Sequence, residues 1–560
     1  YFNNFKELFI HFYGTVVKLY NKFLIGCLAL GALSACTDRF ESMNTDPSSL
    51  VNVSPAYILP FVQETGVNLD ATPYQRGDNL HSQMYCQYFT NTVQGWTSDR
   101  YGYNDGWAEP GYWTPYYTTL KHLKEVKAMA AETPSYTNYC QMVRITVAYG
   151  TIGMTDTFGD IPYSEAGLGG SSPKYDVQKN IYYDVFNELT EAVDILKQNL
   201  AGQEPCGENN DLVYAGNIQK WIKFANSLRL RYALRLSYID PDKAKSEGEA
   251  ALQSGVMESN DDNAYMRITA AGGWGHPLYM ICNWNCFTMS KTMENILKKS
   301  STVADPRMPL WFGQTVGYKN NQKAPKPSFK GEQFQGVPSG RTDAELLAAD
   351  VDGYIANSPD NNSCVYGLKA FPDWNANRMD GNAPSNTVVP LPFKVMNYAE
   401  VCQLKAEAAL RGWSGAGDIK NNYENGIRAS LAEERDGVDA SLYSTDNDEI
   451  YLTTGNVAWS NTDSDEKKLE KIITQKWLAL YPNGIEAWAE CRRTGYPVLM
   501  PISQSDDPAI NPGNGEFIKK IRYCDAERRD NKENATASSL NQGQGDGMNV
   551  RVWWDTQRYK

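Results

Sequence analysis

The chain has 560 residues, of which 42% are hydrophobic and 21% are charged, and its formal net charge at pH 7 is −13. This composition is typical of a folded globular protein that is long enough to bury a substantial core. The acidic excess argues against nucleic acid, and against an anionic membrane face, as the main partner, because both would repel it. The first 35 residues contain three lysines and one glutamate, so the chain without them is more acidic still.

The N-terminal segment has the order of a lipoprotein signal peptide. Lys18 and Lys22 precede an apolar run over residues 23–31, and Leu33-Ser34-Ala35-Cys36 follows it. A basic region, a short apolar region and small residues before a cysteine are typical of a signal that is cut before the cysteine, which is then acylated. The apolar run is shorter than the about 20 residues that a membrane helix needs. We expect residues 1–35 to be removed and Cys36 to anchor the protein in a lipid bilayer; an ordinary signal peptide cut after Ala35 is the alternative.

The first residues do not fit this signal peptide. The chain opens at Tyr1 rather than Met, and residues 1–16 add nothing that a signal peptide uses. Val17 directly precedes the basic region, as a start codon read as Met would. We therefore expect residues 1–16 to be an upstream artefact.

Helical periodicity dominates the rest of the chain. In Ile181–Leu196 the apolar residues recur with a 3.6-residue period on one face, and Trp221–Leu236 and Lys467–Leu480 also predict long helices. Residues 398–413 and 423–433 predict a helix–turn–helix of the size of a tetratricopeptide unit. We therefore expect an all-α fold. Residues 36–560 would form a single large helical domain, with tetratricopeptide-like helix pairs and long irregular loops that carry little β structure.

Three long polar connections interrupt the predicted helices. They cover residues 96–117, 313–363 and 528–549. Connections of this length inside a folded domain tend to be functional or mobile. The chain contains no Pro/Ser-rich linker that would divide it, so these segments are expected to be loops of the one domain.

Cysteine and histidine usage disfavours a metal centre. Of the 11 cysteines, nine remain after Cys27 in the signal and Cys36, and the chain has four histidines. Cys282 and Cys286, with His276 nearby, could form a metal site or a local disulfide, but their spacing lacks a second pair of ligands. We interpret most of the nine as buried free thiols and predict no metal site.

Catalytic signatures are missing. The sequence contains no H-E-x-x-H, G-x-S-x-G or Walker A motif and no strand-flanked G-x-G-x-x-G. The acidic segments at residues 350–353 and 446–449 fail the EF-hand spacing, and we interpret them as solvated turns, with a structural calcium as the alternative. We therefore expect a protein that is not an enzyme and has no cofactor. A pair of glycosidase carboxylates is the enzymatic alternative, because sequence order does not give their separation.

Six segments in order along the chain resemble the SusD/RagB family of lipoproteins. They are Phe40–Pro47, Phe158–Ala166, Trp221–Arg231, Asn397–Ala409, Glu486–Pro497 and Val552–Asp555. Within them Asp160, Arg229 and Arg493 are similar to helix caps and buried ion partners. One departure is Cys524, where the family usually has proline after the tyrosine.

The resemblance implies a surface-exposed, non-enzymatic nutrient-binding lipoprotein of Bacteroidota-type bacteria. It would lie in the outer membrane, facing outside, as a lid on a SusC-like TonB-dependent transporter. Most relatives in the family bind glycans and some bind peptides. An oligosaccharide is therefore the expected ligand. The first alternative is a peptide-binding lipoprotein of the same family. Further alternatives are a surface enzyme that degrades glycans and an adhesion lipoprotein.

The ligand-binding residues are predicted from aromatic content. Residues 96–117 are rich in tryptophan and tyrosine but contain no phenylalanine. A surface that is apolar on its face and wet at its edge favours these two residue types, and a sugar can stack on it. Further tryptophans lie in loop-like sequence. The candidate ligand-binding residues are Trp96, Tyr101, Tyr103, Trp107, Trp113, Trp274, Trp284 and Trp374. The alternative is that several of these rings anchor loops to the helical body or face the transporter.

Overall fold

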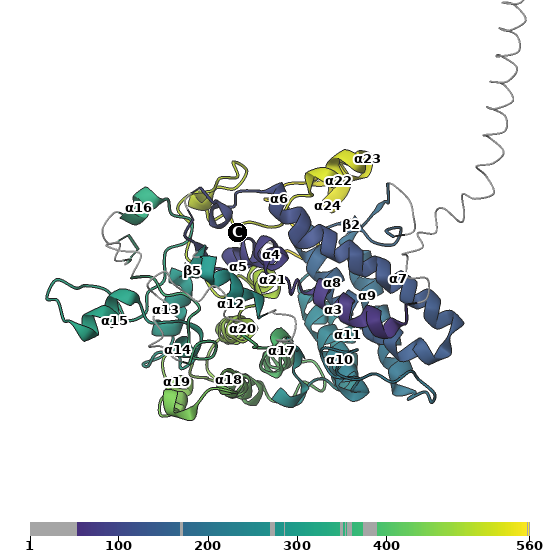
Figure 1. Ribbon diagram of the computed structural model, residues 1–560, viewed down its shortest axis with the longest axis horizontal. Helices are drawn as coiled ribbons and strands as arrows, with labels where there is room; N and C mark the ends of the chain where they lie inside the picture. The colour runs from purple at the N-terminus through teal and green to yellow at the C-terminus, as the bar shows by residue number, and fades with distance from the viewer. Residues whose placement is uncertain are drawn as a thin grey trace, which may run out of the picture. The chain divides into compact units, whose positions relative to one another are not determined.

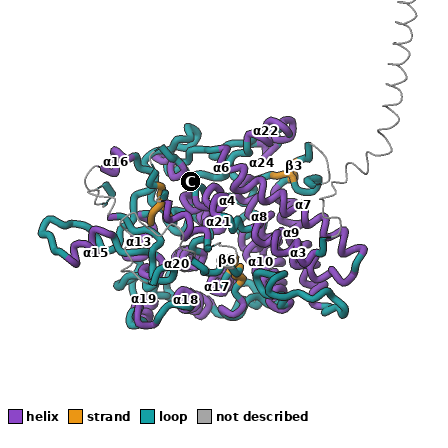
Figure 2. Tube along the Cα trace, viewed as in Figure 1, coloured by secondary structure: helices purple, strands orange, loops and turns teal. Residues whose placement is uncertain are grey.

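Helices make up most of the structure, as the apolar periodicity predicts (Figures 1 and 2). A computed structural model describes residues 53–93, 95–167, 172–268, 275–284, 286–347, 351–352, 354, 361–372, 389–556 and 558. The predicted signal peptide, Cys36, Trp274 and Trp374 lie outside these residues. Within the part of the chain that the structure describes, every helix is too short or too polar to span a bilayer.

The first group of long helices forms one side of the body, on the right of Figure 1. Its members are α3 (Pro55–Gly66), α7 (Thr114–Glu132), α8 (Thr137–Phe158), α9 (Gln178–Lys197), α10 (Ile218–Arg235) and α11 (Pro241–Ser254). Helix α8 packs against α3, α7 and α9, and α10 packs against both α9 and α11. The stripe predicted in Ile181–Leu196 is buried in α9, because its apolar residues face these neighbours.

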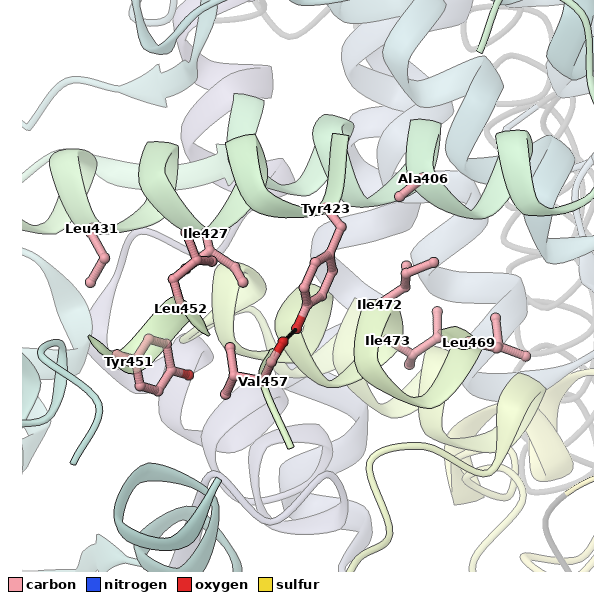
Figure 3. Packing of buried hydrophobic residues seen from close by; sticks show 10 residues of the cluster. All are labelled: Ala406, Tyr423, Ile427, Leu431, Tyr451, Leu452, Val457, Leu469, Ile472 and Ile473. Carbon is pink, nitrogen blue, oxygen red and sulfur yellow. Dashed lines mark hydrogen bonds between the residues drawn. The ribbon is translucent and has the colours of Figure 1, made fainter. Parts of the chain in front are cut away.

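The second group contains the predicted helix–turn–helix. Its members are α17 (Tyr398–Leu410), α18 (Ile419–Arg435), α20 (Asp465–Leu480) and α21 (Gly484–Thr494). Helices α17, α18 and α20 pack against one another around an apolar cluster, and α17 also contacts α10 of the first group (Figure 3). In the cluster Tyr423 Oη donates a hydrogen bond of 2.7 Å to the Val457 carbonyl. The prediction of a tetratricopeptide-like pair is therefore confirmed.

Short helices and three two-stranded ribbons connect these groups. The ribbons pair β1 (Phe89–Asn91) with β5 (Phe287–Met289), β2 (Ile161–Pro162) with β3 (Tyr175–Asp176), and β4 (Ala264–Met266) with β6 (Phe393–Met396), all antiparallel. The short α-helices are α4 (Ala71–Tyr74), α5 (Ser82–Tyr85), α6 (Asp105–Ala108), α12 (Pro277–Ile281), α13 (Lys291–Lys299), α14 (Met308–Trp311), α15 (Val316–Lys323), α16 (Asp343–Leu347), α19 (Asp448–Thr453), α22 (Asp525–Asp530), α23 (Lys532–Ala535) and α24 (Leu540–Gly543). The 3₁₀ and π turns are η1 (Gln75–Asn79), η2 (Ser98–Arg100), η3 (Glu109–Trp113), η4 (Pro134–Tyr136), η5 (Asn260–Asp262), η7 (Cys282–Trp284), η9 (Ala440–Leu442) and η10 (Pro512–Asn514). Little β structure is present, as expected.

Residues 96–117 are not the irregular loop that their composition predicts. They contain η2, α6, the π turn η3 and the start of α7. Gly111 of η3 lies against Gly77 of the second π turn, η1, and a Cβ atom on Gly111 would lie 2.3 Å from the Gly77 nitrogen. The backbones of η1 and η3 are therefore in direct contact at these two glycines. Gly111 thus permits the close packing of these two turns.

A network of buried charges joins the two groups of helices. We use the name charge network for Arg231, Arg235, Glu400, Glu407, Lys476, Glu486, Glu490 and Arg493. Arg231 donates to both oxygens of Glu400, at 2.7 and 2.6 Å. Arg235 pairs with Glu486 at 2.5 Å and Glu490 at 2.6 Å. These contacts tie α10 to α17 and α21.

The rest of the charge network ties α17, α20 and α21 together. Arg493 pairs with Glu407 at 2.7 Å and with Glu490 at 2.6 Å, and Lys476 lies 3.1 Å from Glu486. Burial alone would raise the pKa of Glu486, but Arg235, Lys476 and Arg231 lower it. The expectation that Arg493 is a buried ion partner is confirmed, and Arg229 pairs with Glu247 at 2.6 Å.

Asp160 caps a helix, as the sequence predicts. Its carboxylate accepts a 2.9 Å hydrogen bond from the Gln178 backbone nitrogen at the start of α9. It also accepts one of 2.8 Å from the backbone nitrogen of Asn541. One side chain therefore fixes the start of α9 against the C-terminal segment.

Candidate functional site

The β1–β5 ribbon directs the chain segments of two predicted tryptophans to one of its ends. Asn91 is the last residue of β1 and pairs with Phe287, the first residue of β5. Beyond this pair the Thr92 nitrogen donates a 3.1 Å hydrogen bond to the Cys286 carbonyl. The chain that leaves β1 and the chain that enters β5 therefore lie side by side. Trp96 follows on the first and Trp284 precedes on the second.

A side-chain-stabilised turn fixes Trp96. Asn91 Nδ2 donates to the Trp96 carbonyl at 2.7 Å, and Asn91 Oδ1 accepts from the Val93 nitrogen at 3.0 Å. This is the Asx-type bonding that favours asparagine in turns. The ring of Trp96 meets that of Trp107, from α6, edge to face with centroids 5.3 Å apart. Both rings are half-buried, whereas Trp284 is 47% exposed.

We use the name tryptophan cluster for Trp96 and Trp107, whose rings are in contact, together with Trp284 on the neighbouring chain. Two of the rings are half-buried and the third is exposed, and an indole with an accessible face and an N–H group is suited to stacking against a ligand that is partly apolar and partly polar. The structure therefore brings three of the eight predicted residues to one end of the ribbon. Trp274 and Trp374 fall outside the described residues.

The other predicted rings lie deeper. Tyr101 is 3% exposed and packs against Tyr85 and Phe517, and Trp113 is 9% exposed and packs against Phe158. Such burial is the expected behaviour of loop anchors. Because the segment is helical, its residues alternate between surface and core, and the exposed surface is smaller than the whole segment suggests. Ligand contact by Tyr101 and Trp113 stays a prediction.

Tyr103 lies between these extremes. Its hydroxyl donates to Asp105 Oδ1 at 2.8 Å, and the Arg522 guanidinium lies 4.0 Å from the ring centroid. Burial, followed by the bond to Asp105, raises the pKa of Tyr103. The ring is half-buried and one of its faces is occupied by Arg522, so at most the other face is free for a ligand.

Beneath the tryptophan cluster lie polar residues that the sequence did not single out. The His81 ring is 6.5 Å from Trp107, and its Nδ1 lies 2.8 Å from the Arg76 carbonyl. A carbonyl only accepts, so Nδ1 carries the proton and donates. Burial lowers the pKa of His81 to about 4, so the ring is neutral at pH 7. Its Nε2 is buried without a hydrogen-bond partner.

Asp78 is the second such residue. It is buried in η1, where it accepts hydrogen bonds from the hydroxyl of Ser82 and, at 3.3 Å, from the Gly484 nitrogen. Burial raises its pKa to about 7, although the bonds from Ser82 and Gly484 act in the opposite direction. A single buried aspartate in a π turn leaves no periodicity or motif from which it could have been predicted, although π turns often occur at functional sites.

These residues do not form a hydrolytic triad. His81 Nδ1 is held by backbone carbonyls, and the Ser82 hydroxyl donates to Asp78 and lies 3.1 Å from the Tyr112 hydroxyl. A serine nucleophile needs a histidine nitrogen in contact with its hydroxyl. What this end of the ribbon offers is stacking surface rather than an activated nucleophile.

The cysteines between residues 86 and 524 are free thiols. Cys282 and Cys286 each donate a sulfur hydrogen bond to a backbone carbonyl, and seven of the nine cysteines are buried. This agrees with the interpretation of most of these residues as buried free thiols. Among the described residues no group of three or more histidine, cysteine or acidic side chains could hold a metal ion.

The acidic segment at residues 446–449 is a turn that leads into the start of α19, and it is ion-paired. Asp448 pairs with Arg435 at 2.5 Å, and the Asp446 nitrogen donates to the Ser444 hydroxyl at 3.0 Å. Of the other acidic segment, Asp352 pairs with Arg341 at 2.6 Å. Both segments therefore engage protein groups.

A hollow of about 940 Å³ lies away from the tryptophan cluster. Its lining includes Pro306, Pro309, Leu442 and Tyr443 together with Asn447. None of the predicted ligand-binding residues lines it. Its volume is at the upper end of the range that is usual for small-molecule sites, but among the residues that the structure describes its lining contains no tryptophan.

Comparison with known proteins gives a consistent result. The family model described as SusD-like, the SusD and RagB outer-membrane lipoproteins, matches residues 49–555. A chitin-binding SusD homologue from Flavobacterium johnsoniae is 28% identical, with a TM-score of 0.70 over 90% of this chain and 99% of that one.

Two further solved structures are also SusD homologues. The one from Parabacteroides distasonis is 26% identical, with a TM-score of 0.72 over 90% of this chain and 98% of that one. The one from Bacteroides uniformis is also 26% identical, with a TM-score of 0.71 over 90% and 100% of the two chains. A comparison with curated protein sequences found no match.

Proposed function

Because the chain belongs to the SusD-like family of outer-membrane lipoproteins, we propose that it is a surface-exposed, non-enzymatic protein that binds a nutrient oligosaccharide. It delivers this ligand to a SusC-like TonB-dependent transporter in the same membrane. The acylated Cys36 holds it in the outer leaflet, facing outside. The observation that carries the proposal is the tryptophan cluster at the end of the β1–β5 ribbon.

The energetics of the cluster suit a sugar polymer. A sugar ring that covers roughly 100 Å² of an indole face contributes about 2–3 kcal/mol. Two or three such contacts give micromolar to millimolar affinity once the costs of association are subtracted. Such an affinity lets a ligand bind at the cell surface and still leave for a transporter.

The choice of the first ligands follows from the relatives. One solved relative is described as chitin-binding. Oligomers of N-acetylglucosamine are therefore the first probe, beside α- and β-linked glucose oligomers and a set of short peptides. Titration calorimetry on the soluble domain that starts after Cys36 gives the affinities. Saturable binding of a peptide but of no sugar would replace the oligosaccharide by the peptide alternative.

A matched pair of variants tests the site. Trp284→Ala should weaken binding, because 47% of this side chain is exposed in the cluster. Tyr57→Ala is the control, since Tyr57 is an exposed aromatic residue on α3, a helix that packs against α7 and α8. Equal affinities for both variants and the unchanged protein would place the ligand elsewhere, with the hollow near Tyr443 as the next candidate.

The anchor and the partner need tests in cells. Cys36→Ser should release the protein from membranes into the soluble periplasmic fraction, because the acyl chains are its proposed anchor. A variant that stayed with the membranes after a salt wash would contradict the assignment. Purification of the acylated protein in detergent should recover a TonB-dependent transporter, and recovery of none would favour an adhesion role.

The absence of catalysis is tested with the same ligands. Incubation of the protein with each oligosaccharide that it binds should leave the chain length unchanged, as measured by mass spectrometry. Released shorter products would instead support the glycan-degrading alternative.

A further inference from the structure

A second, separate cavity lies where the β4–β6 ribbon meets α12, α14, α18 and the end of α20. Its volume is about 570 Å³, and its lining includes Tyr265, His276, Trp311, Lys394, Glu434 and Tyr481. No residue of the tryptophan cluster lines it. The volume lies within the range of about 300–1,000 Å³ that is usual for small-molecule sites.

One wall of the cavity presents a buried hydroxyl that has no partner. The rings of Trp311 and Tyr481 stack with centroids 4.5 Å apart, and each side chain is 2% exposed. The Tyr481 hydroxyl makes no hydrogen bond, although buried tyrosine hydroxyls usually find a partner. A donor left without an acceptor in the interior is costly, so an occupant that accepts from it is favoured.

The adjacent indole is directed towards a carboxylate of the cavity wall. Burial raises the pKa of Glu434, but Lys369, Lys394 and a weaker hydrogen bond from Trp311 lower it to about 2. An indole nitrogen can only donate, so the hydrogen of Trp311 Nε1 faces Glu434. The Tyr481 hydroxyl is therefore the donor that remains for an acceptor oxygen in the cavity.

The charges around the cavity disfavour an ion. Lys394 lies 2.7 Å from Glu433 and 2.8 Å from Glu434, so these opposite charges are already paired. The exposed Asp261 and Asp436, which also line the cavity, add negative charge and repel an anion. A cation would meet Lys369 and Lys394, which also line the cavity. A neutral molecule with several acceptor oxygens meets neither obstacle.

We propose that this cavity is a second binding site, for a neutral, oxygen-rich molecule of monosaccharide or disaccharide size. An oxygen of the ligand accepts the hydrogen of the Tyr481 hydroxyl, beside the stacked indole of Trp311. The site goes beyond the proposed function, because it shares no lining residue with the tryptophan cluster and takes a small ligand rather than a polymer.

The test uses the indole of Trp311 as a reporter. The full mature domain is labelled with ¹⁵N-tryptophan, and the Trp311 Nε1–H resonance is assigned by its loss in Trp311→Phe. Glucose, maltose and N-acetylglucosamine are titrated at millimolar concentrations. We expect at least one to shift this resonance saturably, and Tyr481→Phe to weaken that binding about fivefold through the loss of one hydrogen bond.

Two controls keep the result unambiguous. Tyr481→Phe should not lower the melting temperature of the free protein, because its hydroxyl has no protein partner to lose. Trp284→Ala should leave the Trp311 titration unchanged, so that failure of the tryptophan cluster and failure of this cavity are distinguished. No shift with any of the three sugars, or a shift of equal affinity in Tyr481→Phe, would overturn the proposal and leave water as the occupant.

Discussion

The charge network and the surroundings of the tryptophan cluster differ in how their buried polar and charged groups are paired. In the charge network every cation has a carboxylate within hydrogen-bonding or ion-pair distance, as Arg493 has in Glu407 and Glu490. Around the ribbon, Asn79, His81, Tyr85 and Ser98 each have a buried polar atom with no partner. The first region secures the relative positions of the helices. The second leaves more of its buried polar atoms without a hydrogen bond, whereas in the charge network only Arg235 Nε does so among the described residues. Proteins tolerate such unpaired groups chiefly where function requires them.

The same contrast appears in the pKa values of the acids. Arg235, Lys476 and Arg231 outweigh burial and lower the pKa of Glu486, whereas burial prevails at Asp78 and raises its pKa to about 7. Acid therefore acts on the two regions with opposite signs. Glu486 stabilises the fold above the pKa of an unfolded glutamate, and that contribution is lost as the pH falls through its lowered folded value. Asp78 contributes most to stability below the pKa of an unfolded aspartate, and that contribution is lost as the pH rises through its raised folded value.

The largest expected effect comes from breaking the charge network. Arg493→Ala should lower the free energy of unfolding by about 3–5 kcal/mol, because Glu407 and Glu490 would remain buried without this partner. Urea denaturation followed by circular dichroism measures it. The control is Arg529→Ala, since Arg529 is an exposed residue of α22 whose pair with Asp530 should contribute nothing measurable. Equal urea midpoints for the two variants would show that the network does not support the fold.

The next effect is a pH dependence at Asp78. Its unfolded carboxyl ionises near pH 4 and its folded carboxyl near pH 7, so the folded state binds one more proton between these values. The contribution of Asp78 is therefore greatest below pH 4. It falls by about 1.4 kcal/mol per pH unit as the pH rises, a loss of about 4 kcal/mol by pH 7.

Asp78→Asn isolates this dependence, because asparagine keeps the shape and cannot ionise. The difference in unfolding free energy between variant and unchanged protein should grow in favour of the variant from pH 4 to pH 7. Parallel stability curves would contradict the raised pKa. The charge network is untouched by this substitution, so its loss of stability below pH 4 should persist in both proteins.

A third effect separates the inner rings from the outer ones. Trp113→Ala should cost about 3 kcal/mol of stability, at the low end of the range for buried tryptophan, because the ring packs on Phe158. The affinity of the fraction that remains folded should change little. Thermal melts beside ligand titrations measure both quantities, and a large loss of affinity without a loss of stability would return Trp113 to the binding surface.

The smallest effect is expected at the edge of the cluster. Trp96→Ala should weaken ligand binding by about 1–2 kcal/mol, less than a full sugar stack, because the ring is half-buried and shares its edge with Trp107. Titration calorimetry with the ligand found for the unchanged protein measures it. Trp96→Phe serves as the matched control, since it keeps an aromatic face and should recover most of the affinity.

Local patterns predicted the helices well. The stripe over Ile181–Leu196 lies within α9, and Lys467–Leu480 lies within α20. These predictions succeeded because an apolar face repeats every few residues and needs no information from the rest of the chain. The resemblance at Arg493 also identified a true buried ion partner.

Contacts between distant segments were beyond such patterns. Arg231 and Arg235 lie four residues apart on one face of α10, but only the folded chain shows that Glu400 and Glu486 face them. The proximity of Trp96 to Trp284 depends on a ribbon of three residues a strand, which is too short to give an alternating pattern. The sequence therefore pointed to tryptophan and tyrosine as candidate ligand-binding residues, but it did not indicate which of them lie on neighbouring segments.

The β1–β5 ribbon also has a consequence for the order of folding. Its two strands are separated by most of the first group of helices, so its hydrogen bonds form only after a long stretch of chain has been closed into a loop. Contacts of such high sequence separation are entropically expensive and tend to form late. The tryptophan cluster then exists only in the finished molecule. In a partly folded chain Trp96 and Trp284 would still be far apart, because the ribbon between their segments has not formed. Ligand binding would then indicate that folding is complete.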